Sequence, residues 1–344
     1  MKRLIFLLFC LFFTAGYLFS QLPDKSKKES QKAYNKAVEK IQNGDFAAAI
    51  ENLDICLEYD PGFTSAVLLK AKSYVELGDF NKALENFRVA SEMNPSLGEP
   101  YYYFAYLNFT TDTTAGVLEN LDKAINRGYT GYQAYYYRGL YKLLTEDYTG
   151  AIADLSEAIN KNNTLFKAYH DRATAKRMLG DMQGALYDYR QATNINHDFP
   201  MAFNNMGSVK IILGNYEGAL EDYNVAINLD STFALAYNNR GTVNYYLGDL
   251  DAALEDFNTA IRLDAQYNLA LNNKASVLAK NAMYEEAISI FDTVLQTEDS
   301  FAKAYLNRGL VKELVGDLEG ACSDWNMALS LGINEAAKYV EECK

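Results

Sequence analysis

Small residues recur every 34 positions along the chain, and large apolar residues recur beside them. One series of alanine or glycine comprises Ala37, Ala71, Ala105, Gly139, Ala173, Gly207, Gly241, Ala275 and Gly309. A matching series of large apolar residues comprises Leu53, Phe87, Leu121, Leu155, Tyr189, Tyr223, Phe257, Phe291 and Trp325. Small residues at fixed intervals indicate two helices that approach closely, and the large residues fill the space beside them. A period of this length predicts stacked supersecondary units rather than one globular core.

Each unit reads as a helix, a turn and a second helix. A glycine followed by Asp or Asn ends the first helix in most units, at Gly44, Gly78, Gly180, Gly214, Gly248 and Gly316. Glycine adopts the left-handed backbone that terminates a helix at low cost. Pro61 and Pro95 follow second helices, where a residue that cannot continue a helix is expected.

This pattern resembles the tetratricopeptide repeat family over nearly all of the chain. The clearest copy runs from Ala236-Tyr237-Asn238-Asn239-Arg240-Gly241 through Leu247-Gly248-Asp249 to Ala253 and Ala260. The resemblance implies an all-α, right-handed superhelical solenoid of about nine helix-turn-helix repeats. The predicted repeats are 30–63, 64–97, 98–131, 132–165, 166–199, 200–233, 234–267, 268–301 and 302–335, followed by a capping helix at 336–344. Repeat 98–131 departs most, because residues 110–114 (Thr-Thr-Asp-Thr-Thr) replace the Gly-Asp turn.

The first twenty residues differ from the repeats. Lys2 and Arg3 precede an apolar run, and a small residue, Ser20, precedes the polar Gln21. This order is typical of a secretory signal, and we expect cleavage after Ser20. The alternative is an uncleaved membrane anchor, because apolar residues persist almost to Ser20. Residues 21–29 are expected to be a short flexible lead-in.

The charge of the chain limits its partners. Residues 1–20 contain no acidic side chain, so residues 21–344 carry 45 acidic and 30 basic side chains, a formal charge of −15. Such acidity argues against nucleic acid, whose phosphates require clustered Lys and Arg. Contact with a membrane is expected only if the N-terminal segment stays uncleaved. The sequence carries no signal for a particular oligomeric state.

The cysteines agree with export. Cys322 lies early in the last second helix and Cys343 lies in the predicted capping helix, so in an oxidising compartment this pair could form a disulfide. Cys56 occupies a small-residue core position and is expected to be a buried free thiol. Zinc is the weaker alternative, because no cysteine or histidine cluster supplies four ligands.

Catalytic motifs are not apparent. The two histidines, His170 and His197, have no Ser, Cys or paired carboxylate at a recognisable spacing. We therefore expect no enzyme activity, no cofactor and no metal. His170 lies on a predicted first helix and could face the groove that first helices line in this family, together with its neighbour Asp171.

Four successive repeats carry asparagine two positions before the small residue. These are Asn205, Asn239, Asn273 and Asn307, and three of them follow Asn204, Asn238 and Asn272. Asparagine is a poor helix former, so its repetition inside a helix requires a reason. It resembles the asparagine ladder of the repeat domain of O-linked N-acetylglucosamine transferase, which implies amides that hold an extended polypeptide. The alternative is that these residues support packing between repeats.

The N-terminal half of the expected groove is rich in tyrosine. Tyr102, Tyr106 and Tyr136 are expected to point into it and to offer flat faces with polar tips for protein or sugar recognition. The alternative is that some of them pack against the irregular turn at 110–114.

A further series is structural. Four arginines precede the small residue, and each is followed sixteen positions later by aspartate: Arg138 and Asp154, Arg172 and Asp188, Arg240 and Asp256, and Arg308 and Asp324. Each pair is expected to connect the two helices of one repeat.

Two classes of function remain. The first is a non-catalytic scaffold or adaptor of a bacterial periplasm or cell surface, holding an extended peptide or partner protein in its groove. The second is a module that binds carbohydrate or an envelope polymer through the tyrosines.

Overall fold

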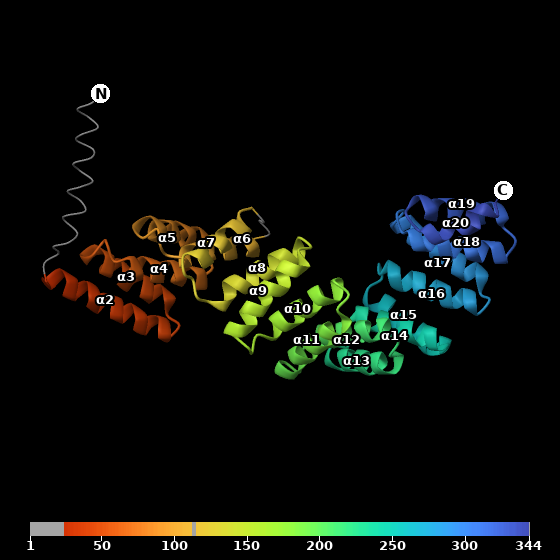
Figure 1. Cartoon of the computed structure of the whole chain (residues 1–344), viewed down its shortest axis with the longest axis horizontal. Coiled ribbons are helices and arrows are strands. Elements are labelled where there is room, and N and C mark those ends of the chain that lie inside the picture. Colours follow the sequence, from red (N-terminus) through yellow and green to blue (C-terminus); the bar gives the residue numbers. More distant parts are fainter. Residues whose placement is uncertain (1–23, 112–114, 344) are drawn as a thin grey trace, which may run out of the picture. The chain divides into compact units, whose positions relative to one another are not determined.

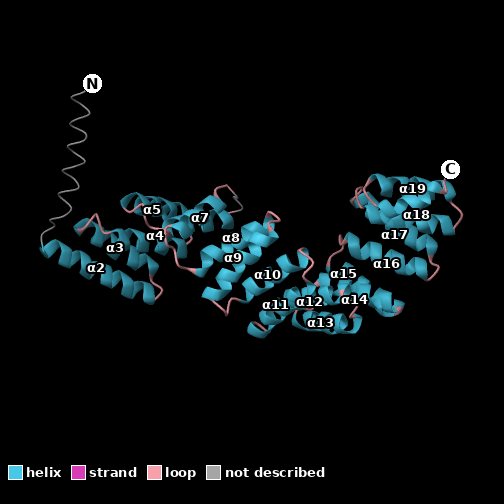
Figure 2. Ribbon diagram, in the orientation of Figure 1, coloured by secondary structure: helices cyan, strands magenta, loops and turns pink. Residues whose placement is uncertain are grey.

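The computed structural model describes residues 24–111 and 115–343, and every regular element in these ranges is a helix (Figure 2). The chain divides into two compact units, one ending at Asn163 and one beginning at Thr164. The signal predicted for residues 1–20 lies outside the described residues.

The first unit contains four helix pairs (Figure 1). Their bounds are α2 (Asp24–Gln42) and α3 (Phe46–Tyr59), α4 (Thr64–Glu76) and α5 (Phe80–Met93), α6 (Glu99–Thr110) and α7 (Val117–Asn126), and α8 (Tyr132–Leu144) and α9 (Tyr148–Lys161). Each second helix also packs against the first helix of the next pair within the unit. The apolar stripes of both helices are buried by this stacking.

The second unit contains five pairs and a cap. Their bounds are α10 (Phe166–Met178) and α11 (Met182–Ile195), α12 (Pro200–Ile212) and α13 (Tyr216–Leu229), α14 (Ala234–Leu247) and α15 (Leu250–Leu263), α16 (Asn268–Lys280) and α17 (Tyr284–Thr297), and α18 (Ala302–Leu314) and α19 (Leu318–Ser330). A 3-10 turn, η2 (Asn334–Ala336), and α20 (Ala337–Glu341) follow and pack on α19. The described chain is thus an all-α stack of helix pairs.

The lead-in expected at residues 21–29 is wrong from Asp24 onward, because α2 begins there. The segment is rich in lysine and glutamate, which are good helix formers. It is also held in place, because Ser26 Oγ donates to the Tyr59 carbonyl at 2.7 Å and Ser30 is buried against the Cys56 thiol. Polar composition alone does not show this anchoring.

The turns inside the repeats explain the Gly-Asp pattern. Gly214 has φ +76°, and the Asn215 side chain then accepts a hydrogen bond from the Gly218 N–H as the N-cap of α13. Besides repeat 98–131, two repeats lack this glycine, and Glu146 and Ala282 occupy the left-handed position there with φ 63° and 59°. Residues with a Cβ are strained in this conformation.

The core follows the two series of the sequence. A Cβ added at Gly309 would lie 2.5 Å from Trp325 Nε1, so a larger residue there requires movement of the indole. The equivalent Ala275 is fully buried beside Phe291 in the same kind of contact. Small and large positions therefore match one another within each repeat.

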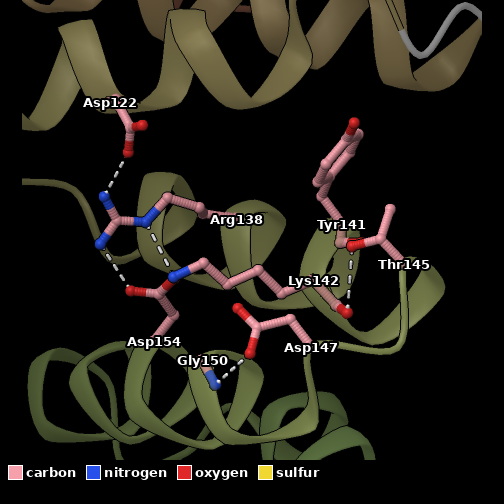
Figure 3. Close-up of polar contacts among 8 residues, drawn as sticks. All are labelled: Asp122, Arg138, Tyr141, Lys142, Thr145, Asp147, Gly150 and Asp154. Carbon is pink, nitrogen blue, oxygen red and sulfur yellow. Dashed lines mark hydrogen bonds and ion pairs between the residues drawn. The ribbon is translucent and has the colours of Figure 1, made fainter.

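The four predicted arginine–aspartate pairs are confirmed. Arg138 donates from Nε and Nη2 to both oxygens of Asp154, at 2.8 and 2.6 Å, and from Nη1 to Asp122 of the preceding repeat at 2.6 Å (Figure 3). Lys142 adds a second cation 2.8 Å from Asp154 Oδ2, and Asp147 caps the next helix at Gly150 (Figure 3). The aspartate is 5 % exposed, and such a buried charge requires partners of this kind.

The capping region contains the expected disulfide. Cys322 on α19 is bonded to Cys343, which follows α20, and Cys56 is a buried free thiol. Tyr339 stacks on Trp325 with ring centroids 5.0 Å apart. The cap thus covers the apolar face that the last repeat presents.

Candidate functional site: the first-helix face of the second unit

Two adjoining pockets lie over the first helices α14, α16 and α18. One has a volume of about 260 Å³ and the other about 240 Å³, and both are lined by Tyr245, Ser276 and Asn307. The first extends over Leu310 and Leu314, and the second extends over Asn273 and other polar groups. We call this pair the groove pockets.

A larger pocket of about 640 Å³ lies in the first unit, but its lining argues against a site. It runs from the turn at Leu77–Gly78 to Thr111, which borders the residues outside the description. Its only charged lining residue, Asp79, caps α5 and pairs with Lys82 at 2.9 Å. The groove pockets offer more converging polar groups.

The groove pockets combine polar and apolar chemistry. Lys280 lines one of the two pockets and Lys303 lines the other, and Lys280 Nζ lies 4.7 Å from the centroid of the Tyr245 ring. Tyr246 and Leu314 are each 63 % exposed beside them. The surface can therefore receive an apolar side chain next to groups that donate hydrogen bonds and carry positive charge.

The ladder asparagines, Asn205, Asn239, Asn273 and Asn307, each bond to a side chain of the preceding first helix. Asn239 Nδ2 donates to Asn204 Oδ1 at 2.9 Å, and the two following repeats repeat this contact at 3.0 and 3.1 Å. Each bond joins residues 35 positions apart, so it connects neighbouring first helices. Asn204, Asn238 and Asn272 are buried, whereas the four ladder residues are half-buried. The amides thus support packing between repeats.

The buried asparagines complete the network by bonding to their neighbours in sequence. Asn204, Asn238 and Asn272 each donate from Nδ2 to the next residue's Oδ1, at 3.2, 3.3 and 3.3 Å. Buried amides without such partners would be costly. The network therefore stabilises the face on which the pockets lie.

His170 and Asp171 close one end of this network. The Asn205 amide nitrogen lies 3.0 Å from His170 Nε2, and His170 Nδ1 lies 3.0 Å from Asp171 Oδ1. The ring also packs against Phe199 and Tyr189, with centroids 5.1 and 5.5 Å away. The two residues predicted for the groove therefore lie at the start of the amide network, on α10.

Asn307 closes the other end, in the groove pockets. Its Nδ2 donates to Asn272 Oδ1 at 3.1 Å and to Ser276 Oγ at 3.4 Å, which uses both amide hydrogens. Leu306 stands where the three preceding repeats have a buried asparagine, and within the described residues no group donates to Asn307 Oδ1. Among the described residues it is the one amide oxygen of the network without a donor.

The predicted tyrosines of the first unit do not form an open surface. Tyr102 is only 6 % exposed, so the expectation that it faces a groove is wrong. Its ring stacks on Tyr129 with centroids 4.7 Å apart and contacts the rings of Tyr103, Tyr106 and Tyr137. Burial raises the pKa of Tyr102 far above its ordinary value and that of Tyr103 to about 12.

Tyr106 and Tyr136 are half-buried beside this cluster. Tyr106 meets Tyr137 edge to face at 5.4 Å, and Tyr136 meets the same ring at 5.5 Å. The cause is the irregular repeat: α7 begins only at Val117, and the segment after it brings Tyr129 against α6. Aromatic stacking therefore occupies faces that a sugar would need.

Sequence reasoning missed several residues of the groove pockets, including Tyr245, Ser276 and Lys280. One signal was present. Exposed large apolar residues recur at the same position of successive first helices, at Met178, Ile212, Tyr246 and Leu314, with Lys280 interrupting the row. Repeated exposed apolar residues on one face are a signal of a binding surface.

Metal-binding clusters and membrane-spanning helices are both absent from the described ranges. Among residues 24–111 and 115–343, no group of three or more His, Cys, Asp or Glu side chains is placed to hold a metal ion. No helix in that part of the chain has the length and apolar character that a membrane span requires.

The sequence matches known repeat families. Models described as tetratricopeptide repeat match residues 40–102 and 234–267, and a TPR repeat model matches residues 207–248. No curated protein sequence matches the chain significantly.

Solved structures show the same fold. A tetratricopeptide repeat protein from Parabacteroides merdae aligns with a TM-score of 0.59 at 19% identity, over 73% of this chain and 98% of its own. A chain of the APC/C hetero-tetramer Cut9–Hcn1 aligns with a TM-score of 0.58 at 15% identity, over 93% and 85%. These likenesses show the fold, and the matched models identify tetratricopeptide repeats in this chain over residues 40–102, 207–248 and 234–267.

Proposed function

We propose that the chain is a non-catalytic protein-interaction scaffold that holds an extended polypeptide over the groove pockets of the second unit. The observation that carries the proposal is that two adjoining pockets share Tyr245, Ser276 and Asn307 on three successive first helices. An extended chain that crosses these helices can place successive side chains in the two pockets. Its backbone can meet the polar groups between them.

The lining suggests the chemistry of the polypeptide. Lys280 and Lys303 favour acidic side chains in the ligand, and Leu310 and Leu314 favour an apolar one. Asn307 Oδ1 accepts hydrogen bonds, so it suits a backbone N–H of the ligand. These groups contact a ligand in different ways, and together they favour a short segment that mixes acidic and apolar residues.

Binding rather than catalysis is also favoured by the state of His170. Both ring nitrogens already have partners, Asp171 on one side and Asn205 on the other. A general base requires a nitrogen that can reach the substrate. The imidazole is therefore better explained as part of the scaffold.

We further propose that the protein acts outside the cytoplasm of a bacterium, in the periplasm or at the cell surface. The N-terminal segment with Lys2, Arg3 and the apolar run supports export. The disulfide between Cys322 and Cys343 also suits an oxidising compartment.

The test compares partner capture by the parent protein and two matched double variants. Tyr246→Ala with Leu314→Ala removes apolar contacts at the groove pockets. Tyr187→Ala with Leu318→Ala removes the same residue types from second helices, where they are 60 % and 62 % exposed. Proteins from envelope extract are captured on each form and identified by mass spectrometry.

We expect one or a few proteins to be captured by the parent and by the control variant and to be lost with the groove variant. Equal capture by all three forms would contradict this location of the site. Enrichment of glycans instead of proteins would support the carbohydrate alternative.

A further inference from the structure

The asparagine network is a single hydrogen-bond chain in which every donor points the same way. Starting at Asn307 on α18, the donors and acceptors follow in the order Asn307, Asn272, Asn273, Asn238, Asn239, Asn204, Asn205 and His170. Each amide donates from Nδ2, and each except Asn307 accepts at Oδ1. The chain links five successive first helices of the second unit, from α18 to α10.

This direction determines the tautomer of His170. The Asn205 group nearest to the ring is an amide nitrogen, which only donates, so Nε2 must accept. The proton of the neutral ring is then on Nδ1, where it is donated to Asp171 Oδ1. Asp171 can accept from Nδ1 in both protonation states of the ring. Only Nε2 therefore changes from acceptor to donor when the ring is protonated.

Protonation of His170 conflicts with the direction of the chain. A proton on Nε2 would face the two hydrogens of the Asn205 amide. The Asn205 amide must therefore turn and present its oxygen to the ring. Its nitrogen would then face the Asn204 nitrogen, and the same conflict passes from amide to amide. The reversal ends only at Asn307, because Asn307 Oδ1 has no donor among the described residues.

We propose that His170 is a proton-binding site coupled through the seven amides to Asn307 in the groove pockets. With neutral His170, Asn307 presents its oxygen to the pockets and keeps its NH₂ bonded to Asn272 and Ser276. With protonated His170, the amides are reversed and Asn307 presents its NH₂. The hydrogen bonds of such a chain strengthen one another, which favours one direction over a mixture.

Few other charged groups contact the imidazole. On α10 itself the charged neighbour is Asp171 at 3.0 Å. From α11, Tyr189 faces the ring and its hydroxyl bonds to Thr174 at 3.0 Å; Arg177 also interacts with that hydroxyl. Phe199 and Asn205 complete the surroundings and are uncharged. Lys176 on the same helix is paired with Asp188.

The coupling has a consequence for ligands that rests on the proposed function. A ligand N–H that donates to Asn307 Oδ1 stabilises the direction that requires neutral His170. Its affinity is therefore higher when His170 is neutral and falls when the ring is protonated. Couplings of this kind typically change affinity by about 5- to 150-fold.

The test needs no ligand, so its outcome is independent of the proposed function. Residues 21–344 are labelled with ¹⁵N and ¹³C, and the two histidine rings are titrated by NMR between pH 4.5 and 9. His197 is exposed and lies outside the network, so it serves as the internal control. The side-chain NH₂ signal of Asn307, assigned by its loss in Asn307→Ala, is followed in the same samples.

Three results are expected. The NMR signal of the Asn307 NH₂ shifts with the same pH midpoint as the His170 titration. The hydrogens of this NH₂ also exchange faster with water below that midpoint. Asn272→Leu raises the His170 midpoint, because fewer amides then have to reverse. Asn326→Leu, a change of the same type on α19 outside the network, leaves it unchanged.

If Asn272→Leu does not fold, Asn307→Ala shortens the chain at its half-buried end, and its His170 midpoint should likewise be raised. The proposal is overturned if the Asn307 NH₂ signal does not respond to the titration of His170. It is equally overturned if breaking the chain leaves both histidine midpoints where they were.

Discussion

Lys210 Nζ lies 2.7 Å from Asp222 Oδ2, and this pair replaces the arginine–aspartate pair that Met206 prevents in its repeat. In the neighbouring repeat, Asp188 has two cations, Arg172 and Lys176, at 2.7 and 2.8 Å. The Asp222 carboxylate is therefore buried with one ion-pair partner where the equivalent carboxylate has two, and the charge of Arg190 acts on it in addition. Burial raises the pKa of Asp222, and Lys210 counteracts this.

Lys210→Met is expected to destabilise the protein more than Lys176→Met. Removing the paired cation of a buried carboxylate typically costs about 3–5 kcal/mol, whereas Asp188 keeps Arg172. The free energy of unfolding in urea at pH 7 measures both variants. Equal losses would show that Asp222 is stabilised by other groups.

The destabilisation caused by Lys210→Met is expected to depend on pH. The folded-state pKa of Asp222 lies above its unfolded value, so the native state binds the extra proton as pH falls. Lowering the pH through that pKa neutralises the carboxylate, so the penalty of Lys210→Met should shrink below neutral pH. A penalty that is constant from pH 7 to pH 4.5 would argue against an ionised, unpaired Asp222.

Two turns are expected to be suboptimal. Glu146 and Ala282 have left-handed backbones, a conformation that costs about 1–2 kcal/mol for a residue with a Cβ. Replacement by glycine removes this cost, but part of the gain is lost because glycine gives the unfolded chain more conformational freedom. Glu146→Gly and Ala282→Gly should therefore each stabilise the protein by up to about 1 kcal/mol. Gly214→Ala, at an equivalent turn with φ +76°, should destabilise it. Thermal unfolding of the three variants checks the order, and a loss of stability in both glycine variants would contradict it.

The repeat pattern predicted much of the fold. A 34-residue period fixes which residues face each other inside one helix pair, so the arginine–aspartate pairs and the matched small and large residues could be found by position alone. Contacts between repeats are harder to predict from the sequence. Asn239 bonds to Asn204, which is 35 positions away rather than 34. Successive helices are displaced by one residue at this contact, and an alignment by period hides that offset.

The irregular repeat shows where prediction failed. The position of Tyr102 suggested a groove residue, but its environment depends on Tyr129, which follows α7. Repeat symmetry is lost at the turn after α6, so the position no longer determines the neighbours. The pockets were missed for a related reason: a pocket needs three helices, and Tyr245, Ser276 and Asn307 come from three repeats.

Ladder asparagines are expected to differ in their effect on stability. Asn239→Ala leaves Asn204 Oδ1 and Asn238 Nδ2 buried without their partner, which costs about 1–3 kcal/mol for each unsatisfied group. Asn307→Ala leaves only one buried group, Asn272 Oδ1, and should cost less. Denaturant unfolding of the two variants measures the difference. If both variants are as stable as the parent, the better helix propensity of alanine outweighs the lost hydrogen bonds.

The disulfide is expected to stabilise the C-terminal cap. Cys322 and Cys343 are 21 positions apart, and closing a loop of this size is worth about 3 kcal/mol in the chain-entropy model. In a solenoid each repeat is stabilised by its own contacts and its neighbours', so reduction should loosen α19 and α20 first. Hydrogen exchange with and without reductant locates the loss, and Cys56→Ser, which keeps the disulfide, is the control. Non-reducing peptide mapping of exported protein should show the two cysteines linked; finding both fully alkylatable without reductant would disprove the bond.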